Sequence, residues 1–201
     1  MDFAAVRQAL EERGYRVTLC PTKEEAAAYL NEQIDGTTVG FGGSVTLQEL
    51  GLYDSLSKHN AVHNHWRVPE GSTPDAVREA AMNTEVYLTS VNGLAETGEL
   101  INIDGTGNRA ASTLFGHKRL YFVVGRNKLA PTYDEALWRA RNIASPKNAQ
   151  RLGRKTPCAE KGERCFDCRS PERICKALIV LWGPTTGCDA EVVLVDEDLG
   201  Y

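Results

Sequence analysis

Apolar residues along the chain switch repeatedly between the spacing of a helix and the spacing of a strand. Near the start, Phe3, Val6 and Leu10 fall on one face of a predicted helix that ends near Gly14. The same pattern predicts strands at residues 15–20, 37–41, 61–65, 86–91, 100–103, 120–124, 177–182 and 191–195. Between them it predicts helices that begin at Thr22, near Leu47, at Thr73, at Asn108 and near Tyr133, the last of which runs towards Ala149.

This alternation, with short connections, predicts a single α/β domain over residues 1–201. We expect a three-layer α/β/α fold in which a mainly parallel sheet lies between helices. Ligands of such sheets gather at the carboxyl ends of the strands. The segments that directly follow strands are therefore the first places to look for a binding site.

The composition fits this fold and argues against a membrane span. The 201 residues are 42% hydrophobic and 25% charged, as in a soluble globular domain. No apolar run approaches the roughly 18 residues that a membrane span needs, and the longest covers only residues 177–182. No hydrophobic leader follows Met1, so we expect a cytoplasmic protein whose thiols stay reduced.

Four of the six cysteines lie close together and predict a metal site within residues 155–176. They are Cys158, Cys165, Cys168 and Cys175. Four thiolates on one segment can enclose a soft metal ion or an iron–sulfur cluster. Paired disulfides or four unrelated buried thiols are the alternatives, but the first suits small secreted domains and the second suits an apolar segment. Only Cys165 and Cys168 have zinc-knuckle spacing, so a four-iron cluster is favoured over zinc.

The segment that carries these cysteines is strongly basic. Residues 147–176 contain nine Lys or Arg and four Asp or Glu, a net charge of +5, whereas the whole chain carries −4 and its remainder −9. Basic neighbours lower thiol pKa values and offset an anionic thiolate site. They could equally hold a phosphate. Nucleic acid is not favoured, because no aromatic stacking platform is present and the rest of the surface would repel it.

Two glycine-rich segments follow predicted strands and are candidates for an anion site. In the first, Gly42 and Gly43 allow close backbone approach, while Ser44 and Thr46 offer hydroxyl groups at a helix start. A simple capped turn is the alternative. The Rossmann and P-loop spacings are both absent.

The second segment runs from residue 89 to 109. Its candidate ligand-binding residues are Asn92, Asp104, Asn108 and Arg109, since the loop amides and the guanidinium can clamp an anion. Turn chemistry throughout is the alternative. Residues 96–99 within this segment predict a hairpin turn.

Two histidines alternate along the strand predicted at 61–65. His63 and His65 would share one face, about 7 Å apart. They could join a metal site or transfer protons, but structural hydrogen bonding is the more usual role of such residues.

The chain resembles the LUD domain of lactate utilization proteins. The resemblance rests on the Gly-Phe-Gly-Gly-Ser-Val-Thr turn, on residues 89–109 and on the Cys-Phe-Asp-Cys-Arg-Ser-Pro-Glu-Arg-Ile-Cys tail, and the tail marks a branch of that family. It implies a fold akin to the sugar-phosphate isomerase and coenzyme A transferase group. It also implies a link to the oxidation of lactate to pyruvate beside iron–sulfur subunits. Related transferases use the glutamate of a Glu-x-Gly turn as nucleophile, which makes Glu96 the candidate catalytic residue.

Two classes of function follow. The first is a redox-associated accessory protein or subunit in lactate or organic-acid oxidation, with a 4Fe–4S cluster at the cysteines and a small anion in the cleft. The second is a transferase, isomerase or hydrolase that acts on an anionic substrate and uses zinc to fasten a loop. The sequence leaves open the substrate, whether catalysis occurs, and whether the chain forms a homo-oligomer or joins other lactate-oxidation subunits.

Overall fold

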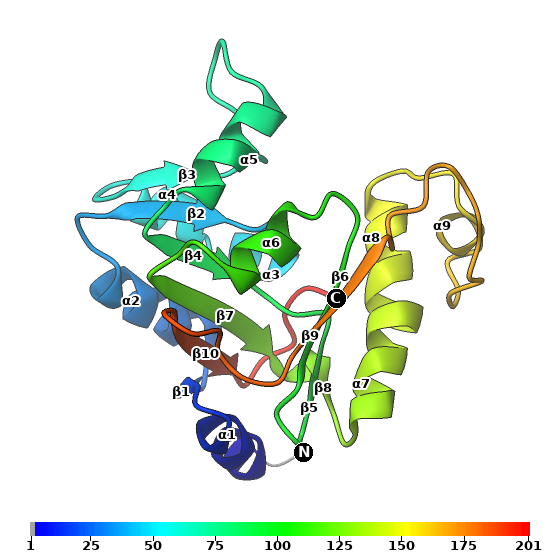
Figure 1. The fold of residues 1–201 in the computed structure, drawn as a ribbon, viewed down its shortest axis with the longest axis horizontal. Helices are drawn as coiled ribbons and strands as arrows, with labels where there is room; N and C mark the ends of the chain where they lie inside the picture. The colour runs from blue at the N-terminus through cyan, green and yellow to red at the C-terminus, as the bar shows by residue number, and fades with distance from the viewer. Residues whose placement is uncertain (1–2) are drawn as a thin grey trace.

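The computed structural model describes residues 3–201 and is built on a six-stranded sheet in which every neighbouring pair is parallel (Figure 1). In spatial order the strands are β1 (Arg16–Cys20), β10 (Asp189–Val195), β7 (Arg119–Gly125), β4 (Val86–Thr89), β2 (Thr38–Phe41) and β3 (Ala61–His63). The predicted parallel sheet is therefore confirmed. Because the strands are parallel, all their carboxyl ends lie along one edge.

Both faces of this sheet are buried, as the apolar runs in its central strands require. In β7, Phe122 and Val124 belong to one hydrophobic cluster and Tyr121 and Val123 to the other, which follows the two-residue repeat of a strand. The Tyr121 face is covered by α2 (Lys23–Gln33), α3 (Val45–Glu49) and α4 (Leu52–Leu56). The Phe122 face is covered by α1 (Phe3–Glu12), α5 (Pro74–Met82) and a second sheet.

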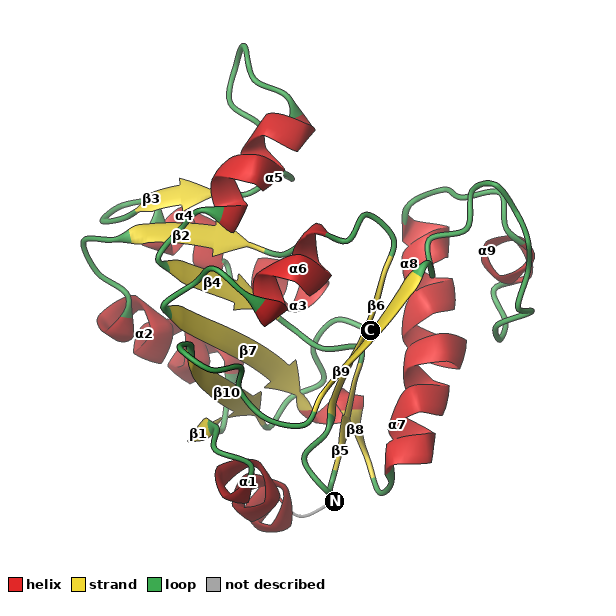
Figure 2. Ribbon diagram, viewed as in Figure 1, coloured by secondary structure: helices red, strands yellow, loops and turns green. Residues whose placement is uncertain are grey.

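The second sheet is a feature that the sequence pattern did not predict. It contains β8 (Leu129–Ala130), β5 (Gly93–Ala95), β6 (Leu100–Asp104) and β9 (Ala177–Leu181) in that order. β6 is antiparallel to both β5 and β9. One side of the sheet packs on the Phe122 face. Its other side packs on Ala136 and Ala140 of the long helix that begins at Tyr133, and this helix lies beyond the sheet in Figure 2. The three-layer α/β arrangement is thus confirmed, with this sheet as an addition.

Three predicted boundaries are corrected by the structure. The strand predicted at 86–91 ends at Thr89, and the chain then crosses to the second sheet. The strand predicted at 61–65 ends at His63, so His65 lies in the following turn and the two histidines do not share a strand face. The helix predicted from Leu47 is two short helices, because Gly51 between them adopts a positive φ of 64°.

The long helix predicted from Tyr133 is present but contains a widened turn. It consists of α7 (Tyr133–Arg139), a π-helical turn over Ala140–Ala144, and α8 (Ser145–Arg151). Pro146 lacks an N–H group and its ring disfavours the regular helical bond at this point. The hydroxyl of Ser145 instead donates to the Ala140 carbonyl over 2.8 Å. The helix therefore continues past Pro146 with a local change of pitch.

After this helix, the chain enters the cysteine segment, which contains the one-turn helix α9 (Pro157–Lys161), and then returns through β9. In residues 3–201, no helix combines the length and the apolar character that crossing a membrane requires.

Candidate functional site

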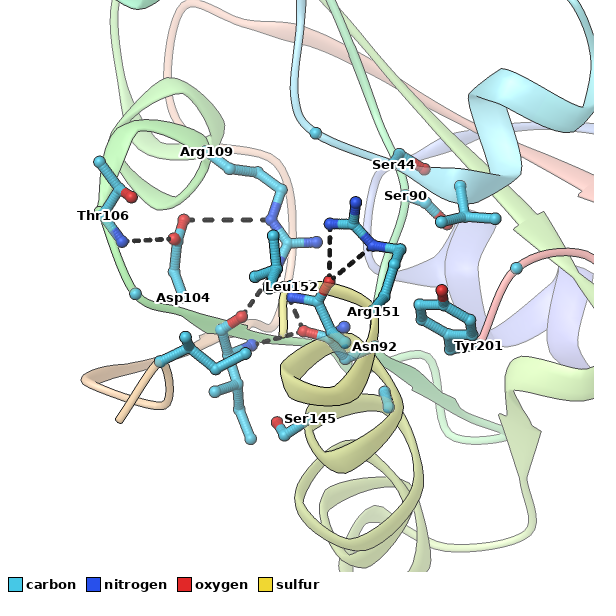
Figure 3. A pocket seen from close by; sticks show the side chains of 18 of the residues that line it. Ser44, Ser90, Asn92, Asp104, Thr106, Arg109, Ser145, Arg151, Leu152 and Tyr201 are labelled. Atoms are coloured by element: carbon cyan, nitrogen blue, oxygen red, sulfur yellow. Dashed lines mark hydrogen bonds and ion pairs between the residues drawn. The ribbon is translucent and has the colours of Figure 1, made fainter. Parts of the chain in front are cut away.

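A cavity of about 320 Å³ opens at the carboxyl edge of the large sheet. Its walls come from the segments that follow β2, β3, β4 and β7, from the β6–α6 loop, where α6 is Asn108–Leu114, from α8, and from residues 171–176. Figure 3 shows Asp104 and Arg109 on one side, Ser44 and Ser90 on the other, and Arg151 between them in this view. A volume of this order fits a small metabolite.

One buried polar group in the cavity wall is the amine of Lys128. Its side chain comes from the short turn after β7 and is only 4% exposed. The amine donates to Thr46 Oγ1 over 2.7 Å and to Ser90 Oγ over 2.8 Å. Burial lowers the pKa of Lys128 to about 7, and the nearby positive charges of Arg139 and Arg109 act in the same direction. This lysine therefore holds both a charged and a neutral form near neutral pH.

A second buried group joins Asp104, Arg109 and Asn92. The Arg109 guanidinium donates to the Ile103 carbonyl over 2.7 Å and to Asn92 Oδ1 over 3.2 Å, and its Nε lies 4.0 Å from Asp104. Burial by itself would raise the pKa of Asp104, but Arg109 and three backbone N–H groups hold it below its ordinary value. Asp104 thus remains ionised and fixes Arg109 in the cavity wall.

The mouth of the cavity is bridged by an aromatic contact. The guanidinium carbon of Arg151 lies 4.6 Å from the ring centroid of Trp66, within cation–π range. His65 lies beside Trp66, and burial together with Arg78 lowers the pKa of its imidazole. His65 is therefore a neutral group in the wall, whereas His63 does not line the cavity.

Positive charge dominates the lining. Two of its residues are acidic, Asp104 and Glu172, while the basic ones are Arg78, Arg109, Lys128, Arg151, Arg154, Arg173 and Lys176. Glu172 already accepts a hydrogen bond from the Lys155 backbone. Across residues 3–201, no carboxylate lies within 4.0 Å of the charged groups of Lys128, Arg151, Arg154 or Lys176. The cavity therefore carries unpaired positive charge.

The structure brings most of the predicted ligand-binding residues to this one cavity. Those that line it are Gly43, Ser44, Thr46, Asn92, Asp104, Asn108 and Arg109. Gly42 lies behind the wall, where a Cβ atom would meet Thr89 Oγ1 at 2.9 Å. Ser44 also caps α3, since its hydroxyl accepts from Leu47 N over 3.3 Å. Whether these residues bind an anion stays a prediction.

Glu96 lies apart from the cavity. It is in the predicted hairpin turn between β5 and β6, whereas Asn92 and Asp104 lie at the other end of the same hairpin. The length of β6 alone separates the two ends by roughly 14 Å at 3.4 Å per residue. The turn is held against α1, because Arg13 donates to the Thr97 carbonyl over 2.6 Å. Glu96 therefore cannot act on a ligand in this cavity.

The four clustered cysteines are free thiols and partly exposed. The Cys165 sulfur accepts from Asp167 N over 3.3 Å, and the Cys158 sulfur lies 3.3 Å from Thr156 Oγ1. In residues 3–201, no three His, Cys, Asp or Glu side chains are grouped so that they could hold a metal ion. As placed, the four thiols do not surround a common point.

The segment that carries these cysteines nevertheless forms part of the cavity wall. Lys176 N donates to the Asp104 carbonyl over 2.9 Å. A Cβ atom on Gly105 would lie 2.6 Å from the Ile174 carbonyl, so only glycine permits this close approach. The basic segment noted in the sequence therefore reaches the cavity through Arg173 and Lys176.

Sequence analysis missed Lys128, Ser90 and Trp66 as lining residues. A signal existed for Lys128, because it follows a long buried strand of the parallel sheet, at the edge where ligands collect. Nothing in the local sequence marks Ser90, which directly follows a buried strand, or Trp66, which lies in a turn.

Comparison with known proteins identifies the family. The sequence pattern of the LUD domain matches residues 4–195, almost the whole chain. The chain belongs to the LUD domain family. This LUD-domain protein is also similar to a DUF162 family protein from Deinococcus radiodurans, with a TM-score of 0.55 and 15% identity over 97% of this chain and 99% of that one. At that identity the likeness concerns the fold alone.

A second solved structure is less similar. Ribose 5-phosphate isomerase from Plasmodium falciparum aligns with a TM-score of 0.35 and 18% identity, over 54% of this chain and 52% of that one. No curated protein matches the sequence.

Proposed function

We propose that this LUD-domain protein binds a small organic anion in the cavity and serves as a redox-associated accessory protein or subunit in the oxidation of lactate or related organic acids. The observation that supports anion binding is the unpaired positive charge of the cavity lining. Lys128 is buried, and a buried cation needs an anionic partner to offset the loss of water, while the exposed Arg151, Arg154 and Lys176 add positive charge around the cavity. The link to organic-acid oxidation is supported by membership of the LUD domain family.

A second candidate function is a transferase, isomerase or hydrolase that acts on the same kind of anion. It is favoured by Lys128, a buried amine with a lowered pKa in the wall of the cavity. The two candidates share the ligand class and differ in whether the cavity performs chemistry.

The four cysteines are a separate proposal. Their support is their position on one basic segment and their free, partly exposed thiols. An iron–sulfur cluster remains favoured over zinc. The anion site does not depend on this centre.

Titration calorimetry with L-lactate, pyruvate and inorganic phosphate tests the anion site. We expect saturable binding to the full chain at low ionic strength and weaker binding as salt screens the charges. The double variant Arg154→Gln with Lys176→Gln should bind about tenfold more weakly, since it loses two charged contacts.

The matched control is Arg7→Gln with Lys58→Gln, which removes the same charge from exposed positions outside the cavity. We expect its affinity to equal that of the unmodified protein. Equal weakening in both double variants would mean that net charge, and not the cavity, attracts the anion. If none of the three probes binds, the proposed function is overturned.

A further inference from the structure

Both hydroxyl partners of Lys128 have committed their own hydrogens elsewhere. Ser90 Oγ donates to the Val123 carbonyl over 2.6 Å, and Thr46 Oγ1 donates to the Leu199 carbonyl over 3.4 Å. Each hydroxyl can therefore only accept from the lysine. Two of the hydrogens on the Lys128 nitrogen are assigned in this way.

The remaining position on the Lys128 nitrogen determines whether the residue acts as a hydrogen-bond donor or as a nucleophile. In the charged form it is a third N–H, and in the neutral form it is the lone pair. Among residues 3–201, the Lys128 nitrogen has Thr46 and Ser90 as its hydrogen-bond partners and no third one, and Lys128 lines the cavity. The two hydroxyls thus orient a neutral amine with its nucleophilic lone pair unblocked by hydrogen bonding within the protein.

The positively charged side chains of the cavity supply the other half of a recognition site. Arg109 is fixed by Asp104 and Asn92 close enough to Lys128 to lower its pKa, while Arg151 and Lys176 are unpaired at the mouth. A ligand that satisfies both halves has an anionic group for the cations and an electrophilic carbon for the amine. Carboxylates and phosphates are the anions that such a set recognises.

We propose that neutral Lys128 forms an imine with the carbonyl carbon of a small anionic carbonyl compound, a 2-oxo acid or a sugar phosphate, held by the cationic side chains of the cavity. This inference rests on the proposed anion site and names its substrate class. The nitrogen lone pair forms the new C–N bond, and the carbonyl oxygen leaves as water with the two hydrogens of the amine. The step involves no oxidation or reduction.

Reductive trapping tests the inference. The full chain is incubated with cyanoborohydride and either pyruvate or dihydroxyacetone phosphate, which separates the two sources of the carbonyl group. Hydride adds to the imine carbon and a proton from water adds to the nitrogen, so the adduct becomes a stable secondary amine. Intact mass and peptide mapping then locate it.

We expect a single adduct at Lys128 with at least one of the two compounds, formed at least about tenfold faster than at solvated lysines, whose ordinary pKa of about 10.4 leaves them almost fully protonated. The variant Lys128→Arg keeps the charge but cannot form an imine, and should give no adduct. The control Lys58→Arg, at an exposed lysine outside the cavity, should still form it. Peptide mapping of the unmodified protein gives the answer even if Lys128→Arg does not fold.

Calorimetry without reductant separates the two failures. Binding of pyruvate or dihydroxyacetone phosphate with no adduct at Lys128 overturns the imine and leaves the anion site standing, with Lys128 as an ammonium anchor. Adducts spread over many lysines also overturn it. No binding of any anion overturns the proposed function, and the imine with it.

Discussion

The cavity and the cysteine segment differ in whether residues that are close in the sequence are also close in the fold. The four cysteines lie within 18 consecutive residues, yet the fold does not gather them around one point. The cavity residues are scattered from Gly43 to Tyr201, and the fold brings them together. Closeness along the chain was therefore the weaker guide to closeness in space.

The physical reason is the different origin of order in the two regions. The cavity is positioned by the parallel sheet, whose register fixes where each strand ends. The cysteine segment has only a one-turn helix and polar contacts of its own. Four thiolates repel one another, so a site of that kind is held together by the free energy of metal binding.

The largest expected effect concerns the cysteines. Protein prepared without oxygen should contain iron or zinc, and Cys165→Ser with Cys168→Ser should remove that metal completely. Elemental analysis with an anaerobic absorption spectrum measures both. The control is Cys20→Ser with Cys188→Ser, which alters the two cysteines outside the segment and should keep the metal. Metal-free protein whose melting temperature does not change in the Cys165 and Cys168 variant would defeat the metal site.

The next effect concerns the cavity wall. A Cβ atom on Gly43 would lie 3.1 Å from both His65 Nε2 and the Trp66 ring, so a larger side chain must displace them. We expect Gly43→Val to weaken anion binding by about tenfold or more, and Gly43→Ala to weaken it less. The backbone at Gly43 has no positive φ, so folding should be retained. Calorimetry and thermal melting measure the two properties. Unchanged affinity in the valine variant would remove this segment from the site.

The smallest effect is on stability and depends on pH. The pKa of Lys128 is depressed on folding to about 7, so the unfolded chain binds more protons between about pH 7 and pH 10. The contribution of Lys128 to the free energy of unfolding of the unmodified protein therefore rises with pH across that window. We expect Lys128→Met to melt about 5 °C higher near pH 6, with the difference shrinking towards pH 10.

Lys176→Met is the matched control, because Lys176 is exposed at the rim. Its melting temperature should differ from the unmodified protein by the same small amount at every pH. If the melting-temperature difference for Lys128→Met were also the same at every pH, holding the charged lysine in the folded state would not reduce stability.

Much of the fold could be predicted because the large sheet follows simple rules. Strands such as β7 and β10 are continuous apolar runs, and the strand and helix alternation favours parallel pairing. The second sheet could not be predicted, since β5 and β8 are too short to show a repeat. Gly51 and Pro146 are visible in the sequence as residues that disturb helices. Whether each one ends the helix or only changes its pitch depends on the packing around it.

The candidate site could be predicted only in part. The segments after β2 and β6 contain glycine and polar residues, which mark them as loops near strand ends. Glu96 shares that local chemistry, but the hairpin turns it to the opposite end. Lys128 carries no local signal of burial, because its low exposure comes from α3 and the last residues of the chain closing over it.

The π-helical turn at Ala140–Ala144 determines the direction in which the side chains of α8 point around the helix axis. One residue of an α-helix corresponds to about 100° of rotation, and the widened turn shifts the succeeding residues by that order. Ala136 before it and Ala140 at its start face the second sheet, whereas Asn148 and Arg151 after it face the cavity. Deleting a single residue here would leave α7 in place and turn Arg151 away from Trp66. The position of the Arg151 charge thus depends on the widened backbone turn as well as on the side chain itself.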